Sequence, residues 1–544
     1  MKSKYNVRPW QAKALKAFEE KLEKDESANF LCVATPGAGK TTFALVCARH
    51  LLGRNDISKV IIIVPSAHLK EQWADSGADL GILLDTDITD MSNESFGVVA
   101  TYQGVAANPQ EFKKISQNAF VILDEIHHAG DDKTWGDSLR VAFTGATTRL
   151  LLSGTPFRSD ENAIPFVKYA NDELVVDFEY GYEAALKDGG VVRPIQFTRL
   201  DGHMEWIDTD GEFNSFSFAQ SIDTKRIQQR LNVALNKDGA FLSNSLSRAN
   251  RYLKRLRKED PTAGGLVICI DHEHAKVVAS LLRKLGAEPT IVLSDDPKAS
   301  EKIGEYANTN SEWLVAVRMV SEGVDIPRLR VGVFATNTTT ELFFRQAVGR
   351  FVRLRSAGEE AMMFIPNDPR IVSHAQTMAQ SRVHVLNKKE DDDTDSILFD
   401  QEAREETWRD DEQLSMFQVL SSTPLHSNDD LLDSPMSKRA KPVVAQITFE
   451  GIEIDLPPLP VSLTTNLKNK DMDFKKMRRT RKALRELNTE RVRALASVSG
   501  DKHASINAKL NTLAGITSIT KASLEQLETR LNHANKLLKV HVKN

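Results

Sequence analysis

The sequence predicts an α/β protein with two doubly wound domains in tandem, an acidic linker and a small, mostly helical C-terminal domain. In the first half, compact apolar runs alternate with amphipathic stretches of helical periodicity, a rhythm typical of parallel sheets covered on both faces. The same rhythm restarts after about residue 241, which indicates a second domain of the same kind. A chain of 544 residues is also too long for one core, since domains average about 150 residues.

Short apolar runs mark the expected buried strands. In the first domain, residues 1–194, these are Phe30–Ala34, Val60–Val64, Val98–Thr101, Phe120–Leu123 and Leu150–Ser153. In the second domain, residues 241–385, they are Gly265–Ile270, Thr290–Leu293, Trp313–Val317, Val331–Ala335 and Ala361–Ile365. Helices are expected between them, for example at Thr41–Leu52 and His68–Ala74. Residues 195–240 break the rhythm and are predicted to be a connection with small elements of its own.

The last third of the chain differs in composition. Residues 386–442 are rich in Asp and Glu with few core signals, so a flexible acidic linker is predicted. Residues 443–544 are predicted to be mostly helical, with basic side chains crowding Lys475–Arg493 and Gly515 as a helix stop. The basic helix is either an additional nucleic-acid contact through phosphate neutralisation, or a solvated face or a partner of the acidic linker. The terminal helices equally suit docking to a partner protein.

Charge and cysteine usage narrow the class of protein. With 71 basic and 75 acidic residues, the net charge of −4 argues neither for nor against a nucleic-acid binder. Cys32, Cys47 and Cys269 are scattered, so no disulfide framework or zinc site is expected and a reducing, cytoplasmic setting is predicted. No apolar run approaches the roughly 18 residues that span a bilayer, so no membrane association is expected.

A phosphate-binding loop is predicted at Ala34–Thr41, between a strand and a helix. Gly37 and Gly39 allow backbone N–H groups to turn inward around phosphate oxygens. Lys40 is expected to reach the terminal phosphates, and the Thr41 hydroxyl to bind Mg²⁺. The ATP-binding residues expected in this loop are Pro36, Gly37, Ala38, Gly39, Lys40, Thr41 and Thr42.

The second half of this site is predicted at Val121–His128, where an apolar strand ends in two carboxylates. Asp124 is expected to hold Mg²⁺ through water, and Glu125 to polarise the attacking water. His127 is interpreted as coupling this site to other motifs. A metal-ligand role for His127 and His128 is disfavoured, because no partner cluster accompanies them. The expected cofactors are therefore ATP and Mg²⁺.

These residues, with an ordered series of further motifs, resemble the superfamily-two DExH-type helicases and translocases over about residues 5–370. The resemblance is closest in style to nucleotide-excision-repair translocases and restriction-enzyme motor subunits. It implies two RecA-like P-loop domains that share one ATP site, and a nucleic-acid track, DNA rather than RNA. Arg8-Pro-Trp-Gln11 resembles the entry motif, which places Arg8 and Gln11 at the cofactor, with the glutamine amide suited to the adenine edge.

Several further segments carry the resemblance. Strand-gripping motifs are implied at Pro65–Trp73 and Val99–Gln103, a coupling motif at Ser153–Pro156, and a motif touching both strand and ATP at Ser321–Pro327. The last of these places Gly323 and Asp325 at the cofactor.

The last motif, Gln346–Arg353, supplies arginines from the second domain. Their spacing predicts that Arg350 and Arg353 lie one helical turn apart on one face. An arginine reaching across a domain interface stabilises the transferring phosphoryl group and accelerates hydrolysis by roughly 10³–10⁵. Ala347 departs from the resemblance, because many relatives carry another arginine there.

Two alternatives belong to other classes of protein. One is an ATPase switch or scaffold that acts through its C-terminal helical domain without nucleic acid; the strand-gripping motifs argue against it. The other is a structural protein with a degenerate ATP site; the presence of Lys40, Asp124 and Glu125 argues against that. Unwinding and translocation are not distinguished, because no motif marks a strand-separating wedge.

Overall fold

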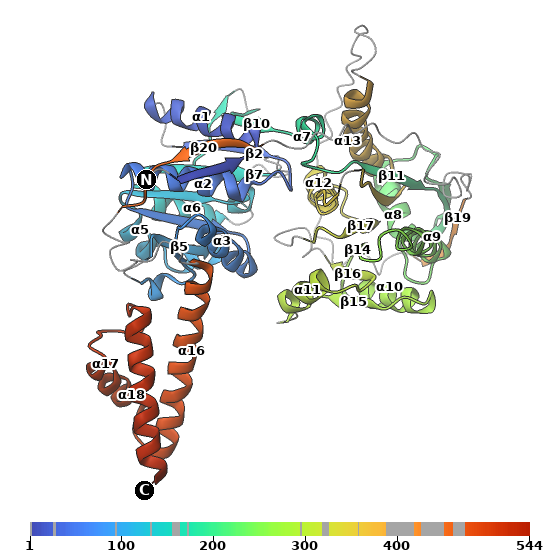
Figure 1. Ribbon diagram of the computed structural model, residues 1–544. Helices are drawn as coiled ribbons and strands as arrows, with labels where there is room; N and C mark the ends of the chain where they lie inside the picture. The colour runs from blue at the N-terminus through green and yellow to red at the C-terminus, as the bar shows by residue number, and fades with distance from the viewer. Residues whose placement is uncertain are drawn as a thin grey trace.

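The computed structural model describes residues 3–24, 29–92, 95–130, 133–154, 164–170, 173–293, 296, 298–317, 326–356, 358–387, 418–425, 451–460 and 474–543. They form two α/β domains, with a helical unit that projects from the first (Figure 1).

The first domain is built on a seven-stranded parallel sheet in the order β10-β2-β7-β6-β3-β5-β4. Its strands are β2 (Asn29–Ala34), β3 (Lys59–Val64), β4 (Leu84–Asp85), β5 (Gly97–Thr101), β6 (Ala119–Leu123), β7 (Thr148–Ser153) and β10 (Phe178–Tyr180). Its helices are α1 (Pro9–Glu23), α2 (Lys40–Arg54), α3 (Ala67–Asp79), α4 (Tyr102–Ala107), α5 (Pro109–Ser116) and α6 (Lys133–Phe143). The next helix, α7 (Tyr182–Asp188), follows β10 and contacts a helix of the second domain. Short 3-10 turns lie at Ile88–Asp90 and Ile126–Gly130, and β8 (Tyr169–Ala170) pairs with β9 (Glu173–Leu174).

Side chains of the central strand β3 alternate between two cores. Val60 and Ile62 pack into one core together with apolar residues of α1, α2 and α3. Ile61 and Ile63 point the other way, into a core with residues of α4, α5 and α6. A strand that is buried on both faces reads as a continuous apolar run, which is why the sequence reveals it.

The second domain has a six-stranded parallel sheet in the order β11-β18-β17-β14-β16-β15. Its strands are β11 (Ile195–Leu200), β14 (Gly264–Cys269), β15 (Pro289–Val292), β16 (Trp313–Val317), β17 (Leu329–Ala335) and β18 (Ala361–Pro366). Its helices are α8 (Thr224–Ala234), α9 (Ala240–Leu256), α10 (His272–Lys284), α11 (Ala299–Asn308), α12 (Glu341–Gly349) and α13 (Pro369–Asn387). The two doubly wound α/β domains of the sequence prediction are thereby confirmed, and each expected buried strand lies in one of the two parallel sheets.

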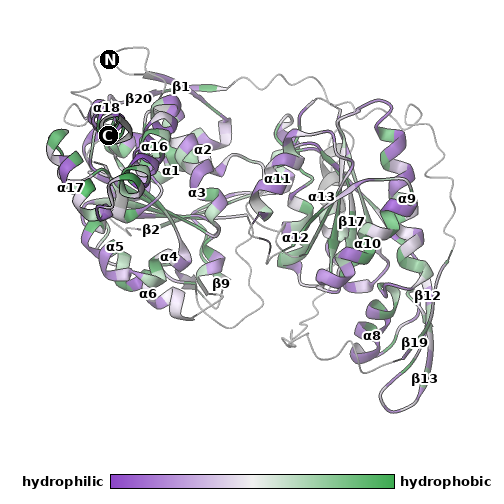
Figure 2. Ribbon diagram, turned by 90° about the horizontal axis from the view of Figure 1, so that it is seen from below, coloured by the Kyte–Doolittle hydropathy of each residue, from purple (hydrophilic) through white to green (hydrophobic). Residues whose placement is uncertain are grey.

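The segment 195–240 differs from the expected connection. Its strand β11 forms the edge of the second parallel sheet, in register with β18 from Ile195↔Ala361 to Leu200↔Pro366. The next two strands, β12 (Gly202–Ile207) and β13 (Phe213–Ser217), join β19 (Gln418–Pro424) in an antiparallel sheet beside α8 (Figure 2). Part of the expected acidic linker is therefore a strand. Pairing between segments so far apart leaves no local periodicity from which to predict it.

The two ends of the chain meet at the first domain. The N-terminal strand β1 (Ser3–Val7) pairs antiparallel with β20 (Ile452–Leu456), from Ser3↔Leu456 to Val7↔Ile452. Arg49 on α2 then donates to the Pro457 carbonyl at 2.5 Å. The chain thus returns to the first domain before its final helices begin.

The C-terminal helical unit consists of α16 (Phe474–Ser499), α17 (His503–Leu513) and α18 (Leu524–Lys543), and α16 approaches α3 in the first domain (Figure 1). Gly515, with φ of +63°, follows α17 as the predicted helix stop. The three cysteines are free and buried. Within the described part of the chain, no helix combines the length and apolar character needed to cross a membrane.

Candidate active site

The loop Ala34–Thr41 connects the carboxyl end of β2 to the start of α2. Gly37 and Gly39 have φ of +77° and +97°, in the left-handed region that favours glycine. Gly39 is the N-terminal cap of α2, and the first N–H groups of a helix have no intrahelical acceptor. The loop therefore presents backbone donors and the positive end of a helix to an anion, as predicted for a phosphate site.

The entry motif holds this loop through its carbonyl groups. Arg8 Nη1 donates to the carbonyls of Gly37 and Ala38, at 3.1 and 2.6 Å. Trp10 Nε1 donates to the Ala38 carbonyl at 3.1 Å, and Gln11 Nε2 to the Gly39 carbonyl at 2.9 Å. The structure thus brings Arg8 and Gln11 to the phosphate loop, where the Gln11 amide is bound to backbone. Its adenine-reading role stays a prediction.

Lys40 and Glu125 form an ion pair at the centre of the site. Lys40 Nζ lies 2.8 Å from Glu125 Oε1, while Glu125 Oε2 accepts a hydrogen bond from Gly154 N at 3.0 Å. Burial alone raises the pKa of Glu125, but the Lys40 ammonium and His127 outweigh it and lower that pKa to about 2. Glu125 is therefore ionised at neutral pH. Gly154 belongs to the predicted coupling motif and directly follows β7, whereas Glu125 follows β6. The hydrogen bond between them therefore joins the ends of these two neighbouring strands.

Asp124 is buried beside this pair. Burial, together with the neighbouring Glu125 carboxylate, raises the pKa of Asp124 to about 6. Its Oδ2 accepts a hydrogen bond from Trp73 Nε1 at 2.9 Å, and its backbone carbonyl accepts one from the Tyr102 hydroxyl at 2.8 Å. A neighbouring cation would stabilise the ionised form of such a buried carboxylate. The chemistry of Asp124 therefore fits the Mg²⁺ that Thr41 and Asp124 are predicted to hold.

The contacts of Trp73 and Tyr102 were not predicted from the sequence. Both residues lie in the segments expected to grip a nucleic-acid strand, Pro65–Trp73 and Val99–Gln103. Each is an aromatic residue with one polar atom, and a buried Trp or Tyr usually places that atom on a partner. That signal points to a buried acceptor, and the structure identifies it as Asp124.

His127 connects the site to the second domain. The ring is 2% exposed, with Nδ1 at 3.0 Å from Ser153 Oγ and 3.6 Å from Glu125 Oε2. On its other side, Nε2 lies 3.1 Å from Gln346 Nε2 on α12. The structure therefore places His127 between the Glu125 carboxylate and the second domain.

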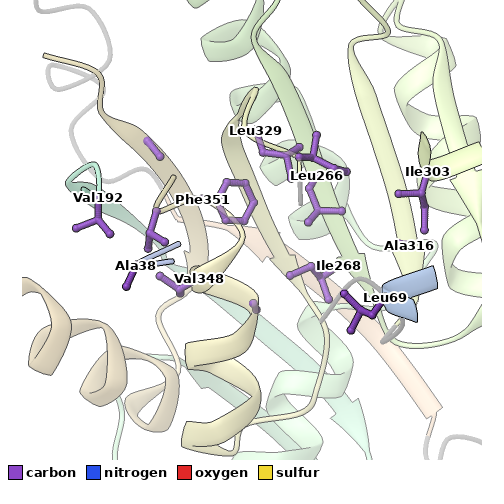
Figure 3. Close-up of a cluster of buried hydrophobic side chains, with 14 of the residues drawn as sticks. Ala38, Leu69, Val192, Leu266, Ile268, Ile303, Ala316, Leu329, Val348 and Phe351 are labelled. Carbon is purple, nitrogen blue, oxygen red and sulfur yellow. The ribbon is translucent and has the colours of Figure 1, made fainter. Parts of the chain in front are cut away.

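The end of α12 lies directly over the phosphate loop. A Cβ atom built on Gly349 would lie 2.7 Å from Pro36 Cγ, so only glycine allows this approach. A Cβ on Gly37 would lie 3.5 Å from Val352 Cγ2 and 3.9 Å from Arg353 Cα. Figure 3 shows Ala38 of the loop beside Val192 and Val348 of the segments that lead into and form the second domain.

The prediction that Arg350 and Arg353 lie on one helical face is wrong. The helix α12 ends at Gly349 and Arg350 is its C-terminal cap, whereas Arg353 lies beyond it, in a β-bridge with Val192. The sequence pattern continues past the end of the helix, so spacing alone misplaced Arg353. Burial, followed by the positive charge of Arg8, lowers the pKa of Arg353. Cations from both domains thus gather near the phosphate loop.

Two expected cofactor residues, Gly323 and Asp325, lie outside the described residues, as do Thr155 and Pro156 of the coupling motif. Thr41 and Thr42 lie in the first turn of α2, directly after Lys40, and are half-buried.

The basic helix α16 contacts acidic residues of α3. Arg478 Nη2 lies 2.5 Å from Glu71 Oε2 and 2.9 Å from Asp75 Oδ1. Lys475 pairs with Asp79 at 2.7 Å, and Lys482 with Glu71 at 3.1 Å. These cations therefore bind the first domain, a partner that the sequence analysis did not consider.

Comparisons with known proteins find one family model and several relatives similar to this chain. A family model described as "Type III restriction enzyme, res subunit" matches residues 4–158. An uncharacterized protein of Mycobacterium tuberculosis is 44% identical over 394 residues, covering 70% of this chain and 65% of that protein. An uncharacterized protein of Mycobacterium leprae is 42% identical over 404 residues, covering 72% of this chain and 67% of that protein.

Among solved structures, a fragment of a putative HsdR subunit of a type I restriction enzyme from Vibrio vulnificus has a TM-score of 0.48 at 18% identity, covering 67% of this chain and 65% of that one. This chain spans about 65% of the length of the M. tuberculosis relative.

Proposed function

We propose that this chain, which belongs to the superfamily-two helicases and translocases, is a DExH-type nucleic-acid motor that hydrolyses ATP between its two RecA-like domains. One observation carries the proposal: the end of α12 closes over the phosphate loop, with Gly349 against Pro36 and Gln346 against His127. A site completed by two domains changes when the domains move, and this is how hydrolysis drives motion in such a motor.

The residues of the first domain suit ATP with Mg²⁺. The phosphate loop offers backbone donors, Lys40 offers a cation, and Thr41 with Asp124 offers the oxygen ligands that Mg²⁺ prefers. Bound MgATP supplies the phosphoryl group that water attacks, and the metal neutralises part of its charge. Glu125, ionised and held by Lys40 and Gly154, is placed to orient that water as a hydrogen-bond acceptor.

In this proposal the second domain contributes two arginines, and Gln346, whose contact with His127 depends on closure of the two domains. Arg353 lies over the phosphate loop and is the best-placed arginine to stabilise a transferring phosphoryl group, with Arg350 beside it at the end of α12. The link from Gln346 through His127 to Glu125 makes the catalytic carboxylate sensitive to the position of the second domain.

We favour DNA over RNA as the track, because the motifs resemble those of nucleotide-excision-repair translocases and restriction-enzyme motor subunits. The segments Pro65–Trp73 and Val99–Gln103 are proposed to grip a backbone, while Trp73 and Tyr102 tie those segments to Asp124. A strand on these loops would therefore be coupled mechanically to the ATP site. The three buried free cysteines support a cytoplasmic location.

A second candidate is an ATPase switch whose C-terminal helical unit contacts a partner protein. The docking of α16 on α3, next to Trp73, supports this second function, because a partner protein bound to the C-terminal helices would act on the same ATP site. A comparison of ATP hydrolysis with and without nucleic acid distinguishes the two functions.

The test is the ATP hydrolysis rate measured with single-stranded DNA, duplex DNA and RNA side by side, followed by an unwinding assay on the best activator. We expect DNA to stimulate hydrolysis most, and Lys40→Ala and Glu125→Gln each to abolish it. Turnover retained in either variant would refute the assigned roles. A rate that no nucleic acid changes would favour the switch.

A further inference from the structure

Arg193 lies in the segment that joins the two domains, two residues before β11. Its side chain is fully buried, at 0% exposure, and each of its three nitrogen atoms donates to a backbone carbonyl. Nε donates to Arg353 at 2.5 Å, Nη1 to Leu329 at 3.2 Å and Nη2 to Pro327 at 2.5 Å. The backbone N–H of Arg193 also donates to the Val352 carbonyl at 2.6 Å.

A buried guanidinium is stable here only if its charge is compensated, because burying a charge costs free energy unless it is paired and hydrogen-bonded. Burial lowers the pKa of Arg193 to about 10, against the opposing carboxylate of Glu359, so the side chain stays charged at neutral pH. The planar fork of arginine reaches three carbonyls in different directions, whereas a lysine ammonium is a single point. The donor geometry is therefore specific to arginine.

The carbonyls that Arg193 binds belong to two parts of the second domain, the segment after α12 and the segment that leads into β17. Val352 and Arg353 lie against Gly37 of the phosphate loop. Pro327 ends the segment Ser321–Pro327, which is expected to touch both the strand and ATP. One side chain thus fixes the main chain of both parts to the interdomain connection.

The residues that precede Arg193 in the chain connect it to the phosphate loop of the first domain. The Tyr182 hydroxyl on α7 donates to the Arg193 carbonyl at 3.1 Å. Tyr180, just before α7, stacks on Trp10 with ring centroids 4.9 Å apart, and Trp10 donates to the Ala38 carbonyl. A continuous set of contacts therefore runs from the first domain through Arg193 to Arg353.

We propose that Arg193 is a positioning residue that sets the place of Arg353 over the phosphate loop and transmits movement of the interdomain connection to it. This inference rests on the proposed ATP hydrolysis. It assigns no contact between Arg193 and the nucleotide; the residue acts through the backbone of Arg353.

The experiment uses Arg193→Lys in the full chain, with nucleic-acid-stimulated ATP hydrolysis and the affinity for a fluorescent ATP analogue as readouts. We expect kcat to fall on the order of 10²-fold, because a displacement of about 1 Å in a catalytic group has that effect. The analogue affinity and KM should change less than about two-fold, since the phosphate loop lies in the other domain. In an Arg353→Ala background, Arg193→Lys should cause no further loss of kcat, because both changes remove the same interaction.

Arg230→Lys is the matched control. Arg230 is also fully buried, and it donates to the carbonyls of Ser217 and Gln220, away from the ATP site. Its replacement should lower the melting temperature without the selective loss of kcat. Equal kcat losses in the two lysine variants would overturn the inference, as would losses that multiply in the Arg353→Ala background.

If Arg193→Lys fails to fold, Tyr182→Phe gives the same test, because it removes the hydrogen bond to the Arg193 carbonyl and keeps the ring. A smaller fall in kcat, absent when Arg353 is Ala, supports the inference; wild-type kcat overturns it. Failure of the proposed function is seen separately, as a wild-type chain without hydrolysis or a Lys40→Ala variant that retains it.

Discussion

His127 Nε2 lies 3.1 Å from Gln346 Nε2, across 219 residues of sequence and between the two domains. On the opposite side of the ring, His127 Nδ1 lies 3.0 Å from Ser153 Oγ and 3.6 Å from Glu125 Oε2. We infer that the imidazole relays the position of α12 to Glu125, the carboxylate expected to orient water.

The first prediction concerns this relay. His127→Ala and Gln346→Ala should each lower stimulated ATP hydrolysis, because each uncouples Glu125 from closure. The double variant should lose less than the product of the single losses, with a coupling energy of about 0.5–3 kcal/mol. Steady-state kcat values for the four proteins measure the coupling; losses that simply multiply would contradict the relay.

The second prediction concerns Trp73 and Asp124. Trp73→Phe removes the indole N–H from a buried carboxylate, a hydrogen bond to a charged group that contributes about 1.5–3 kcal/mol. We expect both the free energy of unfolding and the rate of ATP hydrolysis to fall.

The control for Trp73→Phe is Trp313→Phe, in the second domain. Trp313 is also fully buried, but its indole donates to the neutral side chain of Asn250 at 3.0 Å. This variant should lose less stability and keep its ATPase rate. Denaturant unfolding and steady-state hydrolysis on both variants decide the matter, and equal effects on hydrolysis would contradict a role for the Trp73–Asp124 bond.

The buried parallel strands and the phosphate loop could be predicted from the sequence because each has a local cause. A strand such as Lys59–Val64 is apolar on both faces, and Gly37 and Gly39 occupy positions that need positive φ. Most of the candidate ATP site follows from these features, since the loop after β2 leads to Lys40, and Asp124 and Glu125 follow β6 at the same edge of the parallel sheet.

What the sequence could not reveal depends on contacts between distant segments. The edge strand β11 is only partly buried and pairs with β18 more than 160 residues later, so its local pattern is weak. The pairing of β1 with β20 joins residues about 450 positions apart, and the docking of α16 on α3 joins residues about 400 positions apart. The wrong placement of Arg353 has a local cause: α12 ends at Gly349, whereas the apolar pattern of the sequence continues past that residue.

The third prediction concerns the docking of the C-terminal helical unit. Single exposed ion pairs contribute about 0–1 kcal/mol, but Glu71 and Asp75 each contact more than one cation of α16. Glu71→Gln with Asp75→Asn should therefore release α16, and the amides of α3 should exchange hydrogen for deuterium faster. In the wild type, 1 M salt should have the same effect, because the Debye length falls to about 3 Å.

The control for this release is Glu111→Gln. Glu111 pairs with Lys114 within α5, so its loss should leave exchange in α3 unchanged. Hydrogen exchange in α3 that is insensitive to both the paired neutralisation and salt would show that apolar contacts, rather than charge, hold the unit. Released cations of α16 would also become available to phosphates, so DNA affinity of the neutralised variant should rise, measured across a salt series.

The last prediction separates stability from activity at Gly349. Glycine in a helix is less favourable than alanine by about 0.8–1 kcal/mol, so Gly349→Ala should leave the second domain as stable or more stable. The added Cβ would lie 2.7 Å from Pro36 Cγ and 3.0 Å from Pro36 Cβ, which obstructs closure of α12 over the phosphate loop. Gly304→Ala on α11 is the matched control, because a Cβ there meets nothing within 4 Å. We expect both variants to keep or raise the melting temperature, and only Gly349→Ala to lower stimulated ATP hydrolysis. Unchanged hydrolysis in Gly349→Ala would show that the site does not depend on this contact.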